Sequence, residues 1–120
     1  MRITGFDHLQ IAIPRGGEDE ARAFYGAVLG LEEVPKPAVL AVRGGLWFQC
    51  GRQQLHLGVE DDFRPAKKAH PGMLVEDIEA LMSSLRDAGY EPMIAETLGD
   101  TRRIFIHDPF GNRIEFLERR

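Results

Sequence analysis

The chain has 120 residues, 43% of them hydrophobic and 28% charged, and a formal net charge of −4. These values predict one globular domain over residues 1–120, and the acidic balance argues against a nucleic-acid partner. No run of residues reaches the length of a membrane span, and the chain opens without the apolar core of a signal peptide. The single cysteine, Cys50, cannot form an internal disulfide. We therefore expect a cytoplasmic protein without nucleic-acid or membrane partners.

The first half of the chain, module one at about 1–59, predicts a strand, a helix and three further strands. Apolar residues alternate in the first strand and recur at helical spacing in the helix, and Gly30 is expected to end that helix in the left-handed conformation. The expected elements are a strand at 8–13, a helix from about 19 to 29, a strand at 31–34, and strands at 46–50 and 54–59 joined by a turn at 51–53.

The second half repeats this order. A polar linker at about 60–69 leads into module two at about 70–120, where Asp77 is suited to cap a helix that ends at Gly89. The expected elements are a strand at 70–75, a helix from 78, and strands near 90–95, at 102–107 and at 113–117. The turn at 108–112 consists of residues that tight turns favour, so we assign it a structural role.

The two halves place metal-ligand residue types at matching positions. Gly30 and Gly89 each end a helix, and the same interval separates His56 from Glu115. A strand with one histidine precedes each helix, with His8 in the first half and His70 in the second. The repeat therefore predicts that His8, His56, His70 and Glu115 surround a pseudo-twofold axis.

Strand periodicity supports the same grouping. Each of the four strands has one apolar face, and the opposite face carries one of these side chains among small or polar neighbours. Imidazole and carboxylate groups that converge on one point are typical of a divalent-metal site, for Zn²⁺, Ni²⁺, Co²⁺, Mn²⁺ or Fe²⁺. A binding cleft that keeps polar residues without holding a metal remains the alternative.

Other side chains are candidates for contact with a substrate. Arg43, Arg103 and Arg113 could each recognise an anionic group, and Arg113 is the strongest because it shares the strand face of Glu115. Gln10 shares the face of His8 and is a further substrate-binding candidate. Trp47 could line the same cleft or pack in the core.

Two residues fall outside the predicted site. His107 does not match any ligand position of the repeat, since the interval between the halves pairs it with Phe48, and it is expected to have a structural or supporting role. Cys50 is read as a small strand residue, because no histidine or aspartate partner is suggested that would activate it as a nucleophile.

The chain resembles the vicinal-oxygen-chelate superfamily, also called the glyoxalase/bleomycin resistance protein/extradiol dioxygenase family. The resemblance covers essentially the whole chain and is to a glyoxalase-like member. It is carried by the segments 6–13 (FDHLQIAI), 24–31 (FYGAVLGL) and 108–115 (DPFGNRIE), together with His70 at the opening of the second half.

The resemblance implies an α+β fold in which two βαβββ modules form an open, curved mixed sheet. It also implies one divalent metal ion, with the family's ligands carried over to His8, His70 and Glu115. The fourth position is His56 here, where glyoxalase I enzymes usually have glutamate. The implied activity is that of a metal-dependent lyase or isomerase that chelates a small substrate through neighbouring oxygens and stabilises an enediolate or oxyanion, with Glu115 or His56 as the base.

Other members of the superfamily define the alternatives. Some bind antibiotics such as bleomycin without a metal, some transfer thiols to an antibiotic, and extradiol dioxygenases cleave aromatic rings. Members are commonly homodimers, some of which exchange modules between chains. An exchanged arrangement would take His8 and His56 from one chain and His70 and Glu115 from the other.

Overall fold

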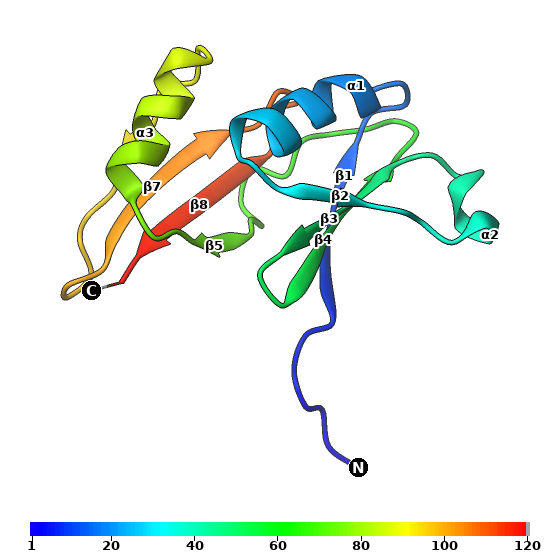
Figure 1. Cartoon of the computed structure of the whole chain (residues 1–120), viewed down its shortest axis with the longest axis horizontal. Coiled ribbons are helices and arrows are strands. Elements are labelled where there is room, and N and C mark those ends of the chain that lie inside the picture. Colours follow the sequence, from blue (N-terminus) through cyan, green and yellow to red (C-terminus); the bar gives the residue numbers. More distant parts are fainter. Residues whose placement is uncertain (120) are drawn as a thin grey trace. The chain divides into compact units, whose positions relative to one another are not determined.

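The computed structural model describes residues 1–119 and contains two compact units, of which Met1–Arg64 is the first and Pro65 opens the second. Each unit is built around its own sheet of four strands (Figure 1). The order of elements in each unit follows the predicted βαβββ pattern, so the predicted fold class, α+β with two such modules, is confirmed. The assignment of residues 1–120 to a single domain stays a prediction.

The first unit has the strand order β1-β4-β3-β2, in which β1 and β4 are parallel and the other neighbours antiparallel. Its elements are β1 (His8–Ile13), α1 (Glu18–Ala21), the π-helix η1 (Arg22–Val28), β2 (Glu32–Val34), α2 (Ala38–Ala41), β3 (Leu46–Cys50) and β4 (Gln53–Val59).

The second unit has the matching order β5-β8-β7-β6, again with its first and last strands parallel. Its elements are β5 (Gly72–Leu74), α3 (Ile78–Asp87), β6 (Met93–Ile94), β7 (Arg102–His107) and β8 (Arg113–Glu118). Asp77 caps α3 as predicted, because its carboxylate accepts a hydrogen bond from the Ala80 N–H at 3.0 Å.

Helix ends follow the glycines, as the sequence predicts. Gly30 and Gly89 have φ values of 75° and 90°, the left-handed conformation that glycine adopts without a steric penalty. The first helix differs from the prediction because it continues after α1 as a π-helix, with Leu29 N–H bonded to Phe24 O. This wider turn accompanies the full burial of two adjacent rings, Phe24 and Tyr25, which meet edge-on.

The remaining differences concern short elements. α2 was not predicted, because four residues after Pro37 are too few to produce helical periodicity. β5 is shorter than the predicted strand, so His70 precedes it, although the Glu115 N–H donates to Pro71 O and extends the ladder. The predicted strand at 90–95 is reduced to β6.

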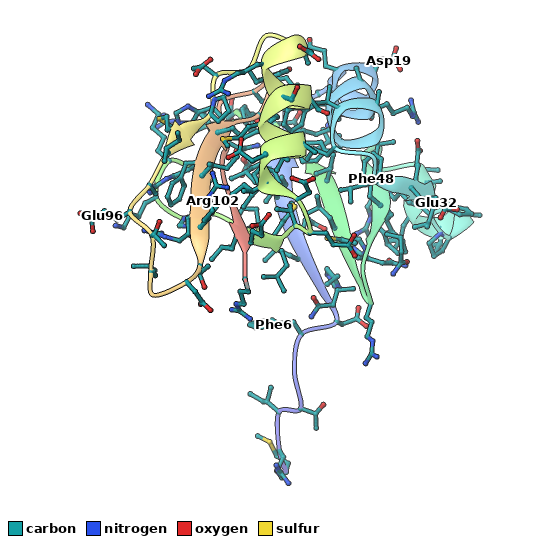
Figure 2. All side chains as sticks on the ribbon, turned by 60° about the vertical axis from the view of Figure 1, so that its left-hand side comes forward. Phe6, Asp19, Glu32, Phe48, Glu96 and Arg102 are labelled. Atoms are coloured by element: carbon teal, nitrogen blue, oxygen red, sulfur yellow. The ribbon has the colours of Figure 1, made fainter. Side chains whose placement is uncertain are left out.

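The core of each unit lies on the face of its sheet that the helices cover. In the first unit, η1 packs over β3, where the Tyr25 and Phe48 rings lie 6.1 Å apart. Figure 2 labels Phe48, as well as Asp19 at the start of α1 and Phe6 on the extended segment before β1. In the second unit, α3 contacts β8, whose buried face carries Ile114 and Phe116. The opposite face of each sheet carries the predicted ligands, and we call it the ligand face.

Candidate functional site

The strand register confirms the equivalence of the predicted positions in the two units. His56 pairs with Gln10, two residues after His8, and Glu115 pairs with Gly72, two residues after His70. Residues paired in a ladder share a face, as do residues two apart in a strand. Each unit therefore places its two candidate ligands at the same diagonal positions of neighbouring strands.

In the second unit, His70 and Glu115 are in direct contact. His70 Nε2 lies 2.9 Å from Glu115 Oε1, and His70 Nδ1 lies 2.9 Å from the backbone oxygen of Lys68. Since the Lys68 oxygen can only accept, Nδ1 carries a proton and donates to it. Both side chains are largely covered, with 26% of the imidazole and 12% of the carboxylate exposed.

The surroundings of Glu115 keep it ionised. Burial by itself raises the pKa of Glu115, but hydrogen bonds from Arg103 and His70 outweigh that effect, and the pKa lies below its usual range. Arg103 makes the stronger contact, because its charged guanidinium donates from Nη1 to Glu115 Oε2 in a charge-assisted hydrogen bond of 2.9 Å. Each carboxylate oxygen thus has one partner.

The His70–Glu115 pair suits a cation. With a proton on Nδ1, His70 Nε2 can donate to Glu115 Oε1 only if the ring carries a second proton; in the neutral ring, the Nε2 lone pair and the carboxylate oxygen are two acceptors that a shared cation can bind. A ligand histidine typically donates its other ring N–H to a carbonyl oxygen, as His70 does to Lys68. The donor types of this pair fit the divalent ion that the sequence predicts.

In the first unit, His8 and His56 are adjacent but stacked. The two ring centroids are 4.2 Å apart with an interplanar angle of 17°, and Trp47 stacks on the other side of His56 at 4.0 Å and 3°. His56 is buried between them, at 5% exposure, whereas 42% of the His8 side chain is exposed. The three rings form a continuous stack, Trp47–His56–His8.

This stack affects how the two histidines can coordinate. His8 Nδ1 lies 2.9 Å from an Asp7 carboxylate oxygen, and His56 Nε2 lies 2.9 Å from Gln54 Oε1, so each ring has one nitrogen left as an acceptor. In stacked rings these lone pairs lie in nearly parallel planes and do not converge. Coordination of one ion by both histidines therefore requires the more exposed ring, that of His8, to turn.

Burial and the neighbouring His8 lower the pKa of His56, and together they outweigh the opposite effect of Asp7. The imidazole is consequently neutral at pH 7, which leaves its unprotonated nitrogen available to accept a proton.

The predicted substrate-binding residues all lie on the ligand faces. Trp47 belongs to the ring stack, and the side chain of Gln10 lies over Gly58, where an added Cβ would come within 2.6 Å of Gln10 Nε2. Arg113 lies over the Phe105 ring, with its guanidinium carbon 4.2 Å from the ring centroid. Within each unit, the described residues contain no group of three or more His, Cys, Asp or Glu side chains that could hold a metal ion.

Sequence reasoning missed Phe105 and did not place Arg103 and His107 beside it on the ligand face of β7. Phe105 pairs with Glu115 as Trp47 pairs with His56, so each unit has an aromatic residue beside its ligand on the last strand. Arg103, rather than Arg113, is the arginine that contacts Glu115. His107 lies opposite Arg113, on the ligand face, and not at the position equivalent to Phe48. The period-two pattern of β7 was the signal that could have identified all three residues.

The turn at 108–112 has the structural role that we assigned to it. One Asp108 carboxylate oxygen accepts from the backbone N–H groups of Phe110 and Asn112, and the Asn112 side chain donates to the other. Asn112 Oδ1 also accepts from Ala66 N–H, while Ala66 O accepts from Arg113 N–H. The turn thus ties residue 66 to the start of β8 and helps to hold Glu115 in register with the segment that contains His70.

No helix within residues 1–119 is long and apolar enough to cross a membrane.

Comparison with known proteins agrees with the fold of the two units. The model of the Glyoxalase/Bleomycin resistance protein/Dioxygenase superfamily matches residues 5–116. A solved structure from Bacillus anthracis, described as a glyoxalase family protein, is 49% identical, with a TM-score of 0.95 over 100% of this chain and 98% of the other. No curated protein gives a significant match.

More distant structures share the fold. The fosfomycin resistance protein FosX from Listeria monocytogenes is 14% identical with a TM-score of 0.78, over 98% of this chain and 94% of its own. Lactoylglutathione lyase from Agrobacterium tumefaciens is 24% identical with a TM-score of 0.67, over 92% and 91%. Because the family model spans nearly the whole sequence and both units repeat one βαβββ pattern, the chain belongs to the Glyoxalase/Bleomycin resistance protein/Dioxygenase superfamily.

Proposed function

We propose that the protein is a small cytoplasmic, metal-dependent enzyme of the glyoxalase type, a lyase or isomerase that acts on a substrate with neighbouring oxygens. The observation that carries this proposal is the His70–Glu115 pair, in which an imidazole nitrogen and a carboxylate oxygen, two common metal-ligand atoms, lie 2.9 Å apart. His8, His56, His70 and Glu115 are the proposed ligands of one divalent ion, Zn²⁺, Ni²⁺, Co²⁺, Mn²⁺ or Fe²⁺. When bound, such an ion supplies Lewis-acid polarisation of the substrate oxygens.

The two proposed catalytic residues suit different tasks. Glu115 is held as an anion by Arg103 and His70, and a carboxylate with a lowered pKa is a weak base but a good cation ligand. His56 is neutral because its pKa is lowered by burial, so it can take up a proton at pH 7. We therefore favour His56 as the base, acting after it dissociates from the ion, and Glu115 as the charged ligand of the cation.

The proposed substrate-binding residues have complementary chemistry. Trp47 offers a flat apolar surface, Gln10 offers an amide, and Arg113 offers a guanidinium, all on the ligand faces. A small, polar and partly planar metabolite fits these three groups.

We also propose that the protein works as a homodimer, as the family resemblance implies. If the two units of one site come from different chains, diluting the protein to monomer should release the bound metal. Full metal content in a proven monomer would rule out that exchange.

A metal-free ligand-binding protein is the second candidate function, and the ring stack favours it. The lone pairs of His8 and His56 do not converge in the stacked arrangement, and three stacked rings resemble a platform for a flat ligand. This candidate includes binding of an antibiotic; thiol transfer to an antibiotic and ring-cleaving dioxygenation remain further activities of the superfamily to be screened.

The test is elemental analysis of protein purified without chelator or affinity nickel. We expect about one transition-metal ion per chain, lost in His8→Ala and in Glu115→Gln. His107→Ala and Glu76→Gln are matched controls, because both side chains are exposed and lie outside the proposed ligand set, and both should keep the metal.

Two results would contradict the enzyme proposal. Wild-type protein that takes up no metal after incubation with the candidate ions would favour the metal-free binding function. Metal that persists in both Glu115→Gln and His8→Ala would mean that the ion is bound elsewhere.

A further inference from the structure

We propose that the substrate carries an anionic oxygen group, a carboxylate or a phosphate, and that Arg113 binds this group. The inference rests on the proposed function and narrows its substrate class. It starts from the position of Arg113, which shares the ligand face with Glu115 and lies two residues before it on β8.

The guanidinium N–H donors of Arg113 have no acceptor among the described residues. Its guanidinium lies 4.2 Å from the Phe105 ring centroid, and within residues 1–119 no hydrogen bond or ion pair to that guanidinium is present. The other two arginines of β7 and β8 are used by the fold: Arg102 pairs with Glu79 at 2.6 Å and Arg103 with Glu115 at 2.9 Å. Arg113 is the arginine of these strands whose guanidinium remains available to a ligand.

The charge on this face also favours an anion. Glu115 is the carboxylate in contact with His70, and the guanidinium of Arg103 already neutralises its charge. Arg113 then adds one uncompensated positive charge beside the His70–Glu115 pair, and His107, opposite it in the ladder, adds no negative charge. A substrate with an anionic group would complete the charge balance, whereas a neutral substrate would leave Arg113 unmatched.

Phe105 gives Arg113 the geometry of a binding group. A guanidinium stacked on a ring keeps its planar fork in one orientation and leaves the N–H donors at its edge free. That fork matches the two oxygens of a carboxylate or phosphate through parallel hydrogen bonds. Phe105 also touches the His70 ring edge-on, with centroids 5.4 Å apart, so one side chain positions both the anion-binding group and a proposed metal ligand.

The test is an NMR titration of the arginine Nε–H signals with three probes. Glycolate combines a carboxylate with a neighbouring hydroxyl, glycolamide is its neutral counterpart, and inorganic phosphate represents the other anion class. We expect a saturable shift of the Arg113 signal with glycolate or phosphate and none with glycolamide. The anion that saturates the shift of the Arg113 signal at the lower concentration identifies the anionic group of the substrate.

Matched variants assign the effect to the guanidinium. Binding by the variants is followed by isothermal titration calorimetry, because replacing Arg113 removes its Nε–H signal. Arg113→Gln should weaken anion binding about ten- to a hundredfold, because a charge-assisted pair of hydrogen bonds is lost, and Arg113→Lys should lie between it and the wild type. Arg52→Gln removes the same charge from an exposed turn in the other unit and should bind like the wild type. Circular dichroism checks that each variant is folded.

The inference would be overturned by the absence of a saturable shift with both anions, by equal binding of glycolamide, or by unchanged binding in Arg113→Gln. Metal content measured on the same samples separates this inference from the proposed function. Metal binding without anion binding at Arg113 refutes only the substrate class. Anion binding at Arg113 by a protein that takes up no metal refutes the metal-dependent enzyme while leaving the anion site in place.

Discussion

Removal of the Asn112 side chain should cost the protein a large part of its stability. Asn112 is 1% exposed, and its side-chain hydrogen bonds include one from Ala66 N–H and one to the Asp108 carboxylate, both 3.0 Å long. A hydrogen bond between neutral groups contributes about 0.5–1.5 kcal/mol and one to a charged group about 1.5–3 kcal/mol. Asn112→Ala should therefore lower the free energy of unfolding by about 2–4 kcal/mol.

Urea denaturation followed by circular dichroism measures this loss. The midpoint should fall while the slope of the transition stays constant, since the surface exposed on unfolding hardly changes. If the two units unfold separately, the loss should be confined to the transition of the second unit, which contains the turn. Asp100→Ala, in an exposed turn of the same unit, is the control and should stay within about 0.5 kcal/mol of the wild type. A similarly small change in Asn112→Ala would refute the assigned role of these hydrogen bonds.

Two further predictions concern the first unit. Gly45→Ala should lower the free energy of unfolding by about 2–4 kcal/mol, because φ is +86° and the added Cβ would lie 2.2 Å from Leu57 O. Gly99→Ala, with φ +62° and open space around it, should lose only about 1 kcal/mol, and equal losses in urea would contradict the steric argument. The hydrogen bond from Gly45 N–H lowers the pKa of Glu18 below 4.5, so this stabilisation is present above about pH 4.5 and is lost as the pH falls through the folded-state pKa. The free energy of unfolding, measured from pH 6 to pH 3, should therefore fall less steeply in Glu18→Gln than in the wild type. An unchanged slope would contradict the stabilising role of the Glu18 carboxylate.

The sequence predicts most of the sheet framework because strand periodicity and glycine positions are local signals. β3 and β7 begin and end at the predicted residues, and the left-handed glycines end the helices where expected. The pairing of His70 with Glu115 follows from the same signals, since two residues on matching faces of paired strands are neighbours. Short elements such as α2 lack enough residues to show a period.

The orientation of side chains within a face was beyond the sequence. His8 and His56 share a face as predicted, but their stacking depends on how Trp47 covers one side of His56. The choice between Arg103 and Arg113 as the partner of Glu115 depends on the register of β7 against β8, which the length of the intervening turn determines. Both features arise from long-range packing, and a pattern along one strand does not contain that information.

The parallel pairing of the first and last strands has a consequence for how the protein folds. In each unit the first strand pairs with the last strand, so that His8 of β1 pairs with Gln54 of β4 and Gly72 of β5 pairs with Glu115 of β8. Closing such a long loop costs chain entropy before any contact compensates for it, and folds dominated by distant contacts form slowly. On the ribosome, β1 must wait with an exposed edge until β4 has been synthesised. His8 and His56 therefore become neighbours late in folding, so a metal ion could capture the finished pair but could not guide the early steps.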